Sequence, residues 1–357
     1  MSRQVKTPRF YVDMPTFLHA TGQRGWDDEK GGVKLLYMNP SNPHLTEVAT
    51  AQELTAFLIG SADNNNPKTS FPINFVALLN HNLGSNTNEF RVVGKHGLSS
   101  ATSVDLYPSA QILNANHATE YISPEWNGTT IFKFTSDDQF WRSFGIYYDG
   151  SNYIDAGTHQ LGSFVVGKYW DAPNSPDLNL TMSRRFEGIK RQKTINGKIL
   201  ANTYYDGSTE WTMNGADGIY KYPAFELDLT GSSLENQDLY AYRAKSGLGR
   251  KGLRSWKLTF SYIGESDMWI DNEVSNTLTS DDVTPNNDIP NPMLSDNSFN
   301  FVWNCTLGGT LPFIFQPDNT NNNPDQFSIC TFRGNSLSVK QVAHNTYSLS
   351  ITIDEVA

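Results

Sequence analysis

The sequence predicts an all-β protein with two β-sandwich domains of the jelly-roll type, one inserted in the other, and very little helix. Composition is the first reason. Charged residues make up only 18% of the 357 residues, and aromatic residues reach 12%. Together with many Gly, Pro, Asn, Ser and Thr residues, this favours short strands joined by turns over helices. Length is the second reason, because a single hydrophobic core stops growing near ~250–300 residues.

Alternation of apolar and polar residues near the C-terminus is the third reason. Trp256, Leu258, Phe260 and Tyr262 recur at every second position. A period of two is what a strand with one buried face requires. The same pattern predicts strands at residues 299–303, 327–329, 337–339 and 347–353. Strands of this kind, without a catalytic constellation among them, favour a structural protein over an enzyme.

The remaining elements are predicted in chain order from apolar runs and turn residues. Residues 9–20 indicate a short strand followed by a loop, and residues 34–38 a second strand. Residues 72–79 form an unbroken apolar run, which predicts a strand covered on both faces and followed by a turn with left-handed backbone. One short helix is expected over residues 264–269, with Ser266 as its cap. Further strands are expected at residues 89–93, 129–134, 140–147, 162–167, 183–205 and 224–229.

The domain organisation is inferred from the two short N-terminal strands. Neither strand can bury its apolar face alone, because small isolated strand pairs are at best marginally stable. We therefore expect them to pair with the region after Ser183, which gives a discontinuous domain of residues 1–44 plus 178–357. Residues 45–177 then form the inserted sandwich, since their short strands are separated by Gly, Asn and Asp turns.

Charge and targeting patterns exclude several classes of function. The formal net charge of −10 argues against nucleic-acid binding, which needs an excess of Lys and Arg on some face. No stretch approaches the ~20 apolar residues of a membrane span, and the N-terminus lacks the apolar run of a secretory signal. We expect a soluble protein without nucleic-acid or membrane partners. The basic cluster of residues 184–193 is expected in a solvated loop at an interface, with an anion site as the alternative.

The two cysteines, Cys305 and Cys330, are too few for a disulfide framework or a metal site. Both fall in predicted strands, so we expect buried free thiols in a chain that folds in a reducing cytoplasm. A disulfide between neighbouring strands is the alternative.

Large aromatic residues provide the candidate protein interface. Tyr204, Tyr205, Trp211 and Tyr220 lie in a Gly-rich stretch that should be solvated. Exposed aromatic residues in such a loop indicate a protein–protein contact. A loop that folds back on its own domain is the alternative.

Three tryptophans provide a candidate glycan contact. Trp126, Trp141 and Trp170 are expected at strand edges of the inserted sandwich, where an indole ring could stack on a sugar. An edge aromatic ring more often packs under a loop, so glycan contact by Trp126 and Trp141 is the alternative to packing.

No catalytic residue, cofactor or metal is predicted. Asp137 and Asp138 are the nearest to an acidic pair, but neighbours in an extended chain point to opposite faces, which suits turn capping better than glycoside hydrolysis. Structural Ca²⁺ is the alternative at these aspartates, and also at the oxygen-rich residues 318–325, where an Asn/Pro turn is favoured. His81 is expected to be a turn residue bonded to nearby backbone, with a sugar contact as the alternative. No Gly-x-Ser-x-Gly elbow or metal-binding histidine spacing is present.

Four motifs follow one another in the C-terminal region. They are an arginine-led alternating strand at residues 254–260, Gly-Gly-Thr-Leu-Pro-Phe-Ile-Phe at residues 308–315, a strand that ends in Arg333, and a final hairpin that closes on Glu355. This order resembles the distal-tail proteins and other tail-tip proteins of tailed bacteriophages. In addition, residues 73–83 and 146–150 resemble the discoidin-like or galactose-binding-like sandwich that such proteins carry. Here that sandwich interrupts the belt domain, whereas in ring-forming distal-tail proteins it follows it.

The resemblance implies a virion structural protein: a tail-tip, baseplate or fibre-attachment subunit that works by protein–protein assembly. The implied partners are other tail or baseplate proteins and copies of the same chain, with contact to a host-surface glycan as an addition. The implied location is the virion tail, after assembly in the cytoplasm of the host bacterium. Two alternatives belong to other classes: a free carbohydrate-binding module or lectin, and a polysaccharide-degrading enzyme that uses Asp137 or Asp138.

Overall fold

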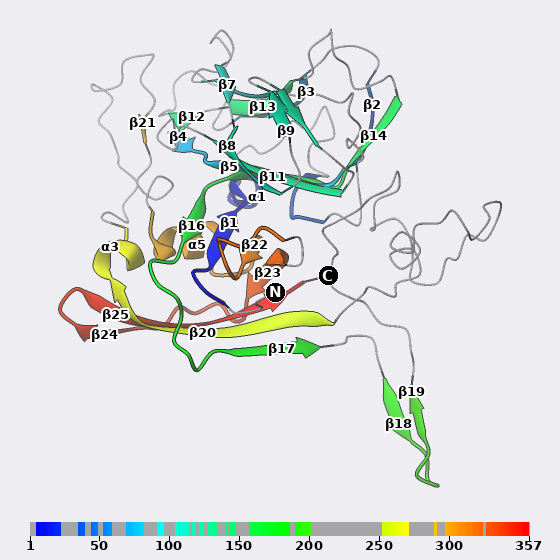
Figure 1. Cartoon of the computed structure of the whole chain (residues 1–357), viewed down its shortest axis with the longest axis vertical. Coiled ribbons are helices and arrows are strands. Elements are labelled where there is room, and N and C mark those ends of the chain that lie inside the picture. The colour runs from blue at the N-terminus through cyan, green and yellow to red at the C-terminus, as the bar shows by residue number, and fades with distance from the viewer. Residues whose placement is uncertain are drawn as a thin grey trace.

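The fold is seen in a computed structural model of the chain (Figure 1). The structure describes residues 5–22, 35–39, 44–48, 53–58, 69–81, 91–95, 104–106, 108–113, 116–118, 121–124, 128–134, 140–141, 143–147, 157–185, 190–201, 252–270, 289–290, 297–323 and 326–356.

The largest sheet has eight antiparallel strands and brings both ends of the chain together. Strand β1 lies between β16 and β22, and strand β25 lies between β23 and β20 (Figure 1). The strands in spatial order are β16 (Tyr169–Asp171), β1 (Arg9–Val12), β22 (Phe313–Gln316), β23 (Ser328–Phe332), β25 (Thr346–Glu355), β20 (Leu253–Gly264) and β17 (Thr181–Arg185), with β24 (Val339–Ala343) paired to β25.

Six smaller sheets complete the described strands, and all their pairings are antiparallel except that of β21 with β4. They are β15 (Ser163–Gly167), β5 (Phe75–His81), β11 (Gly128–Phe134) and β8 (Pro108–Leu113); β3 (Glu53–Leu58), β13 (Ser143–Tyr147), β6 (Arg91–Lys95) and β7 (Val104–Leu106); β12 (Phe140–Trp141), β4 (Thr69–Pro72) and β21 (Ile289–Pro290); β14 (Gly157–Leu161) with β2 (His44–Val48); β10 (Tyr121–Ser123) with β9 (Asn116–Ala118); and β18 (Arg191–Lys193) with β19 (Ile199–Ala201). The prediction of a mostly β protein is confirmed. The jelly-roll arrangement and the insertion of one domain in another stay predictions.

Two of the short helices can be compared directly with the predicted elements. Helix α3 (Glu265–Met268) lies where a helix was expected, but Gly264 is its N-cap and Ser266 lies inside the helix, so the predicted cap is wrong. Helix α1 (Met14–Ala20) replaces the loop predicted after β1. Pro15 suits the first turn of α1, where a backbone N–H has no intrahelical partner.

Helix α5 (Phe299–Cys305) replaces the strand predicted at residues 299–303. Phe299, Asn300 and Phe301 are all buried, because the first turn of this helix is enclosed by the core. The apolar–polar alternation therefore does not reflect a strand with one solvated face. Trp303, predicted on a buried strand face, is only partly buried on α5, and Cys305 ends this helix instead of lying in a strand.

The strand predicted at residues 34–38 is also wrong. Residues 35–39 form turns, and Tyr37 and Met38 have φ angles of 63° and 43°. Such left-handed backbone is incompatible with a strand and uncommon for residues other than glycine.

Strand β20 follows the predicted alternation with one exception. Trp256, Leu258 and Phe260 are buried as expected, whereas Tyr262 is 72% exposed. The register with β25 shifts between Phe260 and Ile263, so Ile263 takes the next buried place. A bulge of this kind changes which side chains face the core.

The apolar run predicted to be covered on both faces is confirmed in β5, where every residue is buried. The turn predicted from Asn80 starts too early, because Asn80 and His81 still belong to β5; Asn80 nevertheless has left-handed backbone, with a φ angle of 50°. Residues 82–84 of the predicted turn lie outside the described residues. The strands expected at residues 129–134 and 162–167 correspond to β11 and β15.

Strand β1 is buried on both faces and joins two hydrophobic clusters. Phe10 and Val12 belong to one cluster, which also contains Phe132 of β11, and Tyr11 belongs to the other, where its ring meets the Phe75 ring at 4.9 Å. Both clusters therefore contain residues from inside and outside residues 45–177. The division of the chain at 44/45 and 177/178 stays a prediction, and its two parts share buried contacts.

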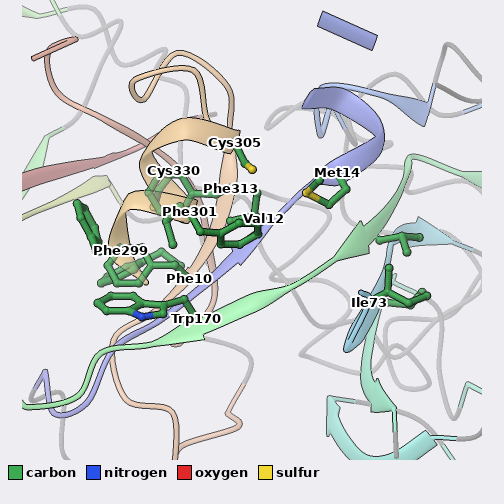
Figure 2. Packing of buried hydrophobic residues seen from close by; sticks show 14 of the residues in the cluster. Phe10, Val12, Met14, Ile73, Trp170, Phe299, Phe301, Cys305, Phe313 and Cys330 are labelled. Carbon is green, nitrogen blue, oxygen red and sulfur yellow. The ribbon is translucent and has the colours of Figure 1, made fainter. Parts of the chain in front are cut away.

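The first cluster is centred on aromatic rings from β1, β16 and α5 that pack tilted or edge-on against one another (Figure 2). The Phe10 ring lies 5.6 Å from that of Trp170 and 6.1 Å from that of Phe299, and Trp170 is 1% exposed. Trp170 was expected at a strand edge, and β16 is indeed an edge strand of the largest sheet. Its indole is part of the core, so it is not available to a sugar.

Candidate protein interface

The candidate interface begins at β17, an edge strand of the largest sheet. Among the described residues β17 pairs only with β20, and all five of its residues are exposed. An edge strand presents unpaired backbone N–H and C=O groups that a strand from another chain can complete.

A hairpin of residues 190–201 follows β17 in the chain and extends away from the sheets (Figure 1). Every residue of β18 and β19 is exposed. The connecting turn is closed by the Thr194 N–H, which donates to the Lys198 carbonyl at 2.8 Å. Gly197 has a φ angle of 78° and its N–H donates to the Thr194 carbonyl at 2.9 Å, as expected for a three-residue hairpin loop that ends in a left-handed glycine. The hairpin thus has internal order but no buried face of its own.

Exposed large apolar side chains are concentrated around this hairpin. Nine such residues occur in the described part of the chain, and five of them lie between residues 178 and 200. They are Leu178, Met182, Ile195, Ile199 and Leu200. Ile195 in the hairpin turn is fully exposed. Apolar side chains that share one exposed segment, instead of being scattered singly, are typical of a contact surface.

The same segment is the basic part of an acidic protein. Residues 178–201, which we call the arm segment, contain six basic residues and one acidic residue, a net charge of +5. The remaining residues carry −15, which together with the arm segment gives the formal −10 of the chain. Arg184, Arg185 and Arg191 lie on exposed strands, so the predicted solvated position of the basic cluster is confirmed, whereas its predicted loop structure is wrong.

The start of the arm segment is fixed to β20 by hydrogen bonds. The Asp177 N–H donates to the Thr259 carbonyl at 2.8 Å, and the Ser261 hydroxyl donates to the Asp177 carboxylate at 2.5 Å. The Leu180 N–H closes the turn on the Asp177 carbonyl at 3.2 Å. Leu178 is therefore held in a fully solvated position by an ordered turn. A backbone that is already ordered loses little entropy when a partner covers its side chains.

The aromatic residues predicted as contact sites are not placed by the structure. Tyr204, Tyr205, Trp211 and Tyr220 lie outside the described residues, and so does Trp126. Trp141 lies in β12, where its backbone pairs with Phe71 of β4, but its side chain is not described. These residues stay predictions.

The apolar residues of the hairpin were missed by the sequence analysis, which singled out aromatic residues only. A signal for them existed, because Asn196-Gly197 between two short β-prone stretches is a strong indication of a two-residue hairpin turn. Basic residues on both sides of that turn argue that the hairpin is not part of a core.

His81 is part of the core. It is 1% exposed, and its Nε2 lies 2.8 Å from the Thr130 hydroxyl of β11. Burial lowers the pKa of His81 to about 3, so the ring is neutral in the folded protein. The predicted turn position is wrong, since His81 is the last residue of β5, and the buried ring is not available to a sugar.

The predicted turn at residues 318–325 is present in its described part. The Asp318 carboxylate accepts hydrogen bonds from the Thr320 N–H at 3.0 Å and the Thr320 hydroxyl at 2.6 Å. It also pairs with Lys6 at 3.1 Å. These partners occupy the oxygens that a cation would need. Among the described residues, no group of three or more His, Cys, Asp or Glu side chains is placed to hold a metal. Asp137 and Asp138 lie outside the described residues.

Both cysteines are buried free thiols, so the prediction of no bridge is confirmed. Burial raises the pKa of Cys305 and of Cys330 far above the usual thiol range. Neither is a reactive nucleophile.

Two arginines of the C-terminal motifs form ion pairs with carboxylates of the last strand, β25. Arg254 at the start of β20 binds Glu355 at the end of β25 through two side-chain nitrogens, at 2.8 and 3.1 Å. Arg333 binds Asp354 through two bonds of 2.7 Å. These pairs hold the last strand in register and have no free functional group for chemistry.

No known family model matches the chain, and no curated protein or solved structure is similar to it. In the described part of the chain, no helix has the length and apolar character to cross a membrane.

Proposed function

We propose that this protein is a structural subunit that assembles with copies of itself and with other proteins through the arm segment. The concentration of exposed apolar and basic side chains between Leu178 and Ala201 carries this proposal. Apolar side chains contribute contact area, and opposite charge on the partner contributes orientation and association rate. The remainder of the chain has a net charge of −15, so it is complementary in charge to the basic arm of a second copy.

The particular assembly that we propose is the tail of a bacteriophage, as a tail-tip, baseplate or fibre-attachment subunit. The support is the motif order that resembles distal-tail proteins. In it Arg254 and Glu355, which stand far apart in the sequence, form one buried pair. We further propose that residues 45–177 are a galactose-binding-like sandwich inserted in a distal-tail-like domain, in line with the pairing of β1 with β22. The subunit works by assembly and not by catalysis.

Self-assembly is tested by measuring the mass of the purified chain in solution. Light scattering after size-exclusion chromatography should give a mass above the 39.9 kDa of one chain. The double variant Ile195→Ser/Ile199→Ser should weaken association by about tenfold or more. Each buried isoleucine side chain is worth roughly 1.5–3 kcal/mol, and 1.4 kcal/mol is about tenfold in affinity.

The matched control is Tyr262→Ser/Val342→Ser, which removes two exposed apolar side chains outside the arm segment. It should leave association unchanged. A wild-type chain that stays monomeric, or equal effects of the two double variants, would contradict the role of the arm. Mass spectrometry of purified virions tests the tail assignment separately, since a true tail subunit must be found there in stoichiometric amount.

A further inference from the structure

Asp13 is a buried carboxyl group at the junction of β1 and α1. Its side chain is 3% exposed, and its Oδ2 accepts a hydrogen bond from the Thr16 hydroxyl at 2.5 Å. Its Oδ1 is buried and has no hydrogen-bond partner among the described residues. Only one of the two carboxyl oxygens of Asp13 therefore has a hydrogen-bond partner among the described residues.

The Thr16 hydroxyl connects Asp13 to a strained turn at residues 35–39, in which Leu35, Leu36 and Met38 are buried and Tyr37 is exposed. Its oxygen accepts a hydrogen bond from the Tyr37 N–H at 2.9 Å. Tyr37 and Met38 both have left-handed backbone, which non-glycine residues adopt only when their surroundings hold them there. The Tyr37 ring is exposed and meets the His19 ring edge-on at 6.0 Å. Another polar anchor of this segment is the Leu35 carbonyl, which accepts a hydrogen bond from the Ser163 hydroxyl at 2.6 Å.

The charged and titratable groups on the surrounding elements do not neutralise Asp13. Arg9 of β1 binds Asp171 at 2.6 Å, and the Lys168 amine lies over the Phe301 ring. Tyr11 donates to Gln316, Cys305 of α5 is a buried thiol, and β15, against which α1 packs, has no titratable residue. His19 and Tyr37 contact each other. The pKa of Asp13 is set by burial, which raises it, and by two hydrogen bonds with Thr16, which lower it.

We propose that Asp13, Thr16 and Tyr37 form a proton-controlled latch that fixes the turn at residues 35–39 when Asp13 is protonated and releases it when Asp13 ionises. A buried carboxylate with one unpartnered oxygen is costly, whereas the protonated form is not. Ionised Asp13 gains by reaching water, and it can do so only if the first turn of α1 moves. Thr16 moves with that turn, and the Tyr37 N–H then loses its acceptor.

The pH range follows from the two states of the latch. In the closed latch the pKa of Asp13 is raised to about 7, whereas a solvated aspartate titrates near 3.9. Between these values the closed latch binds a proton that the open latch does not. The equilibrium constant for opening therefore rises about tenfold per pH unit from about pH 4 to pH 7 and is level above pH 7. The closed latch is favoured at acidic pH.

Hydrogen–deuterium exchange of the full chain, followed by mass spectrometry, tests the latch. After correction for the intrinsic pH dependence of exchange, protection of peptides that cover residues 14–20 and 35–39 should fall by about 50-fold between pH 5 and pH 7. In Asp13→Asn, which keeps an oxygen acceptor for Thr16 but carries no titrating proton, protection of both segments should be the same at both pH values.

Two further variants keep the test decisive. Thr16→Val has nearly the same volume and should abolish protection of the Tyr37 amide at every pH. Asp318→Asn changes a different buried aspartate, one that pairs with Lys6, and should retain the wild-type pH dependence in residues 14–20 and 35–39. Equal pH dependence in wild type and Asp13→Asn, or wild-type protection that does not change between pH 5 and pH 7, would overturn the proposal. If Asp13→Asn does not fold, the wild-type and Thr16→Val measurements still decide it.

Discussion

At the scale of single residues, the C-terminal strands depend on one buried ion pair. Glu355 is 2% exposed and accepts hydrogen bonds from the Arg254 backbone N–H at 2.7 Å and from its guanidinium. Arg254 also donates to the Phe327 carbonyl at 2.7 Å, so it connects β20, β25 and the start of β23. The pair therefore fixes the order of three strands as well as neutralising two charges.

Glu355→Gln should destabilise the protein by roughly 3–5 kcal/mol, because it leaves the Arg254 guanidinium buried without a counter-charge. Urea unfolding followed by tryptophan fluorescence measures this loss. The matched control is Asp354→Asn, which removes the neighbouring carboxylate. Its partner Arg333 is 58% exposed, so solvent screens that pair and the loss should be much smaller. Equal losses in the two variants would contradict the special role of Glu355.

At the scale of elements, the turn between α5 and β22 shows why a glycine pair stands in the motif. Leu307, Gly308 and Gly309 all have positive φ angles. At Gly309 a Cβ atom would lie 2.5 Å from the Cβ of Phe332, whose ring packs on Phe313 at 4.6 Å. The turn thus lets the chain pass directly over β23, and only glycine fits there.

Gly309→Ala should cost roughly 1–2 kcal/mol for the left-handed backbone and roughly 1–3 kcal/mol more for the contact with Phe332. Gly334→Ala separates the two effects, because Gly334 has a similar φ angle of 91° but no atom within 4 Å of the place that the added methyl group would take. Thermal unfolding should therefore show a larger loss for Gly309→Ala. Equal melting temperatures for the two variants would mean that the close approach is relieved by a small shift.

Sequence patterns predicted strands well and the helices α1 and α5 badly. The apolar run in β5 and the alternation in β20 both correspond to strands, because each reflects how the strand is buried. Helices α1 and α5 have only seven residues each. A helix of that length is not stable by itself, so tertiary contacts decide its conformation, and α5 is enclosed by rings from β1 and β16 that no local pattern reveals.

The candidate interface was predicted only in part, for a related reason. The basic cluster could be predicted because the charges of Lys and Arg side chains are read directly from the sequence. The exposure of Ile195 and Ile199 depends on how strands distant in the sequence are arranged: among the described strands, β18 and β19 pair only with each other, which the sequence does not reveal. Aromatic content pointed to other residues, and Trp170 shows that an aromatic residue near a predicted edge can be fully buried.

At the scale of the whole molecule, β1 connects parts of the fold that lie far apart in the sequence. Its register pairs Arg9 with Asp171 on one side and with Gln316 on the other. Tyr11 donates a hydrogen bond of 2.7 Å to the same Gln316, and both residues are buried. The four consecutive buried residues of β1 therefore pair with both neighbouring strands and contribute side chains to both hydrophobic clusters.

Deletion of residues 1–12 should prevent stable folding, because it exposes β16 and β22 together and removes the Phe10 ring from the centre of the aromatic cluster. Limited proteolysis and near-UV circular dichroism would show rapid digestion and loss of the tertiary signal. Deletion of residues 1–4 alone is the control and should leave both unchanged, since β1 starts at Arg9. A shortened chain without β1 that resists protease would contradict the central place of this strand.

The pairing of β1 with β22 has a consequence for biosynthesis. Roughly 300 residues must leave the ribosome after Phe10 before Phe315, its partner in register, is available. At about 5–20 residues per second this delay lasts roughly 15–60 s. Strand β16 can pair with β1 after about half of that time, but the other edge of β1 waits for β22. We expect nascent chains to recruit chaperones early, and refolding from denaturant to be slow and sensitive to protein concentration.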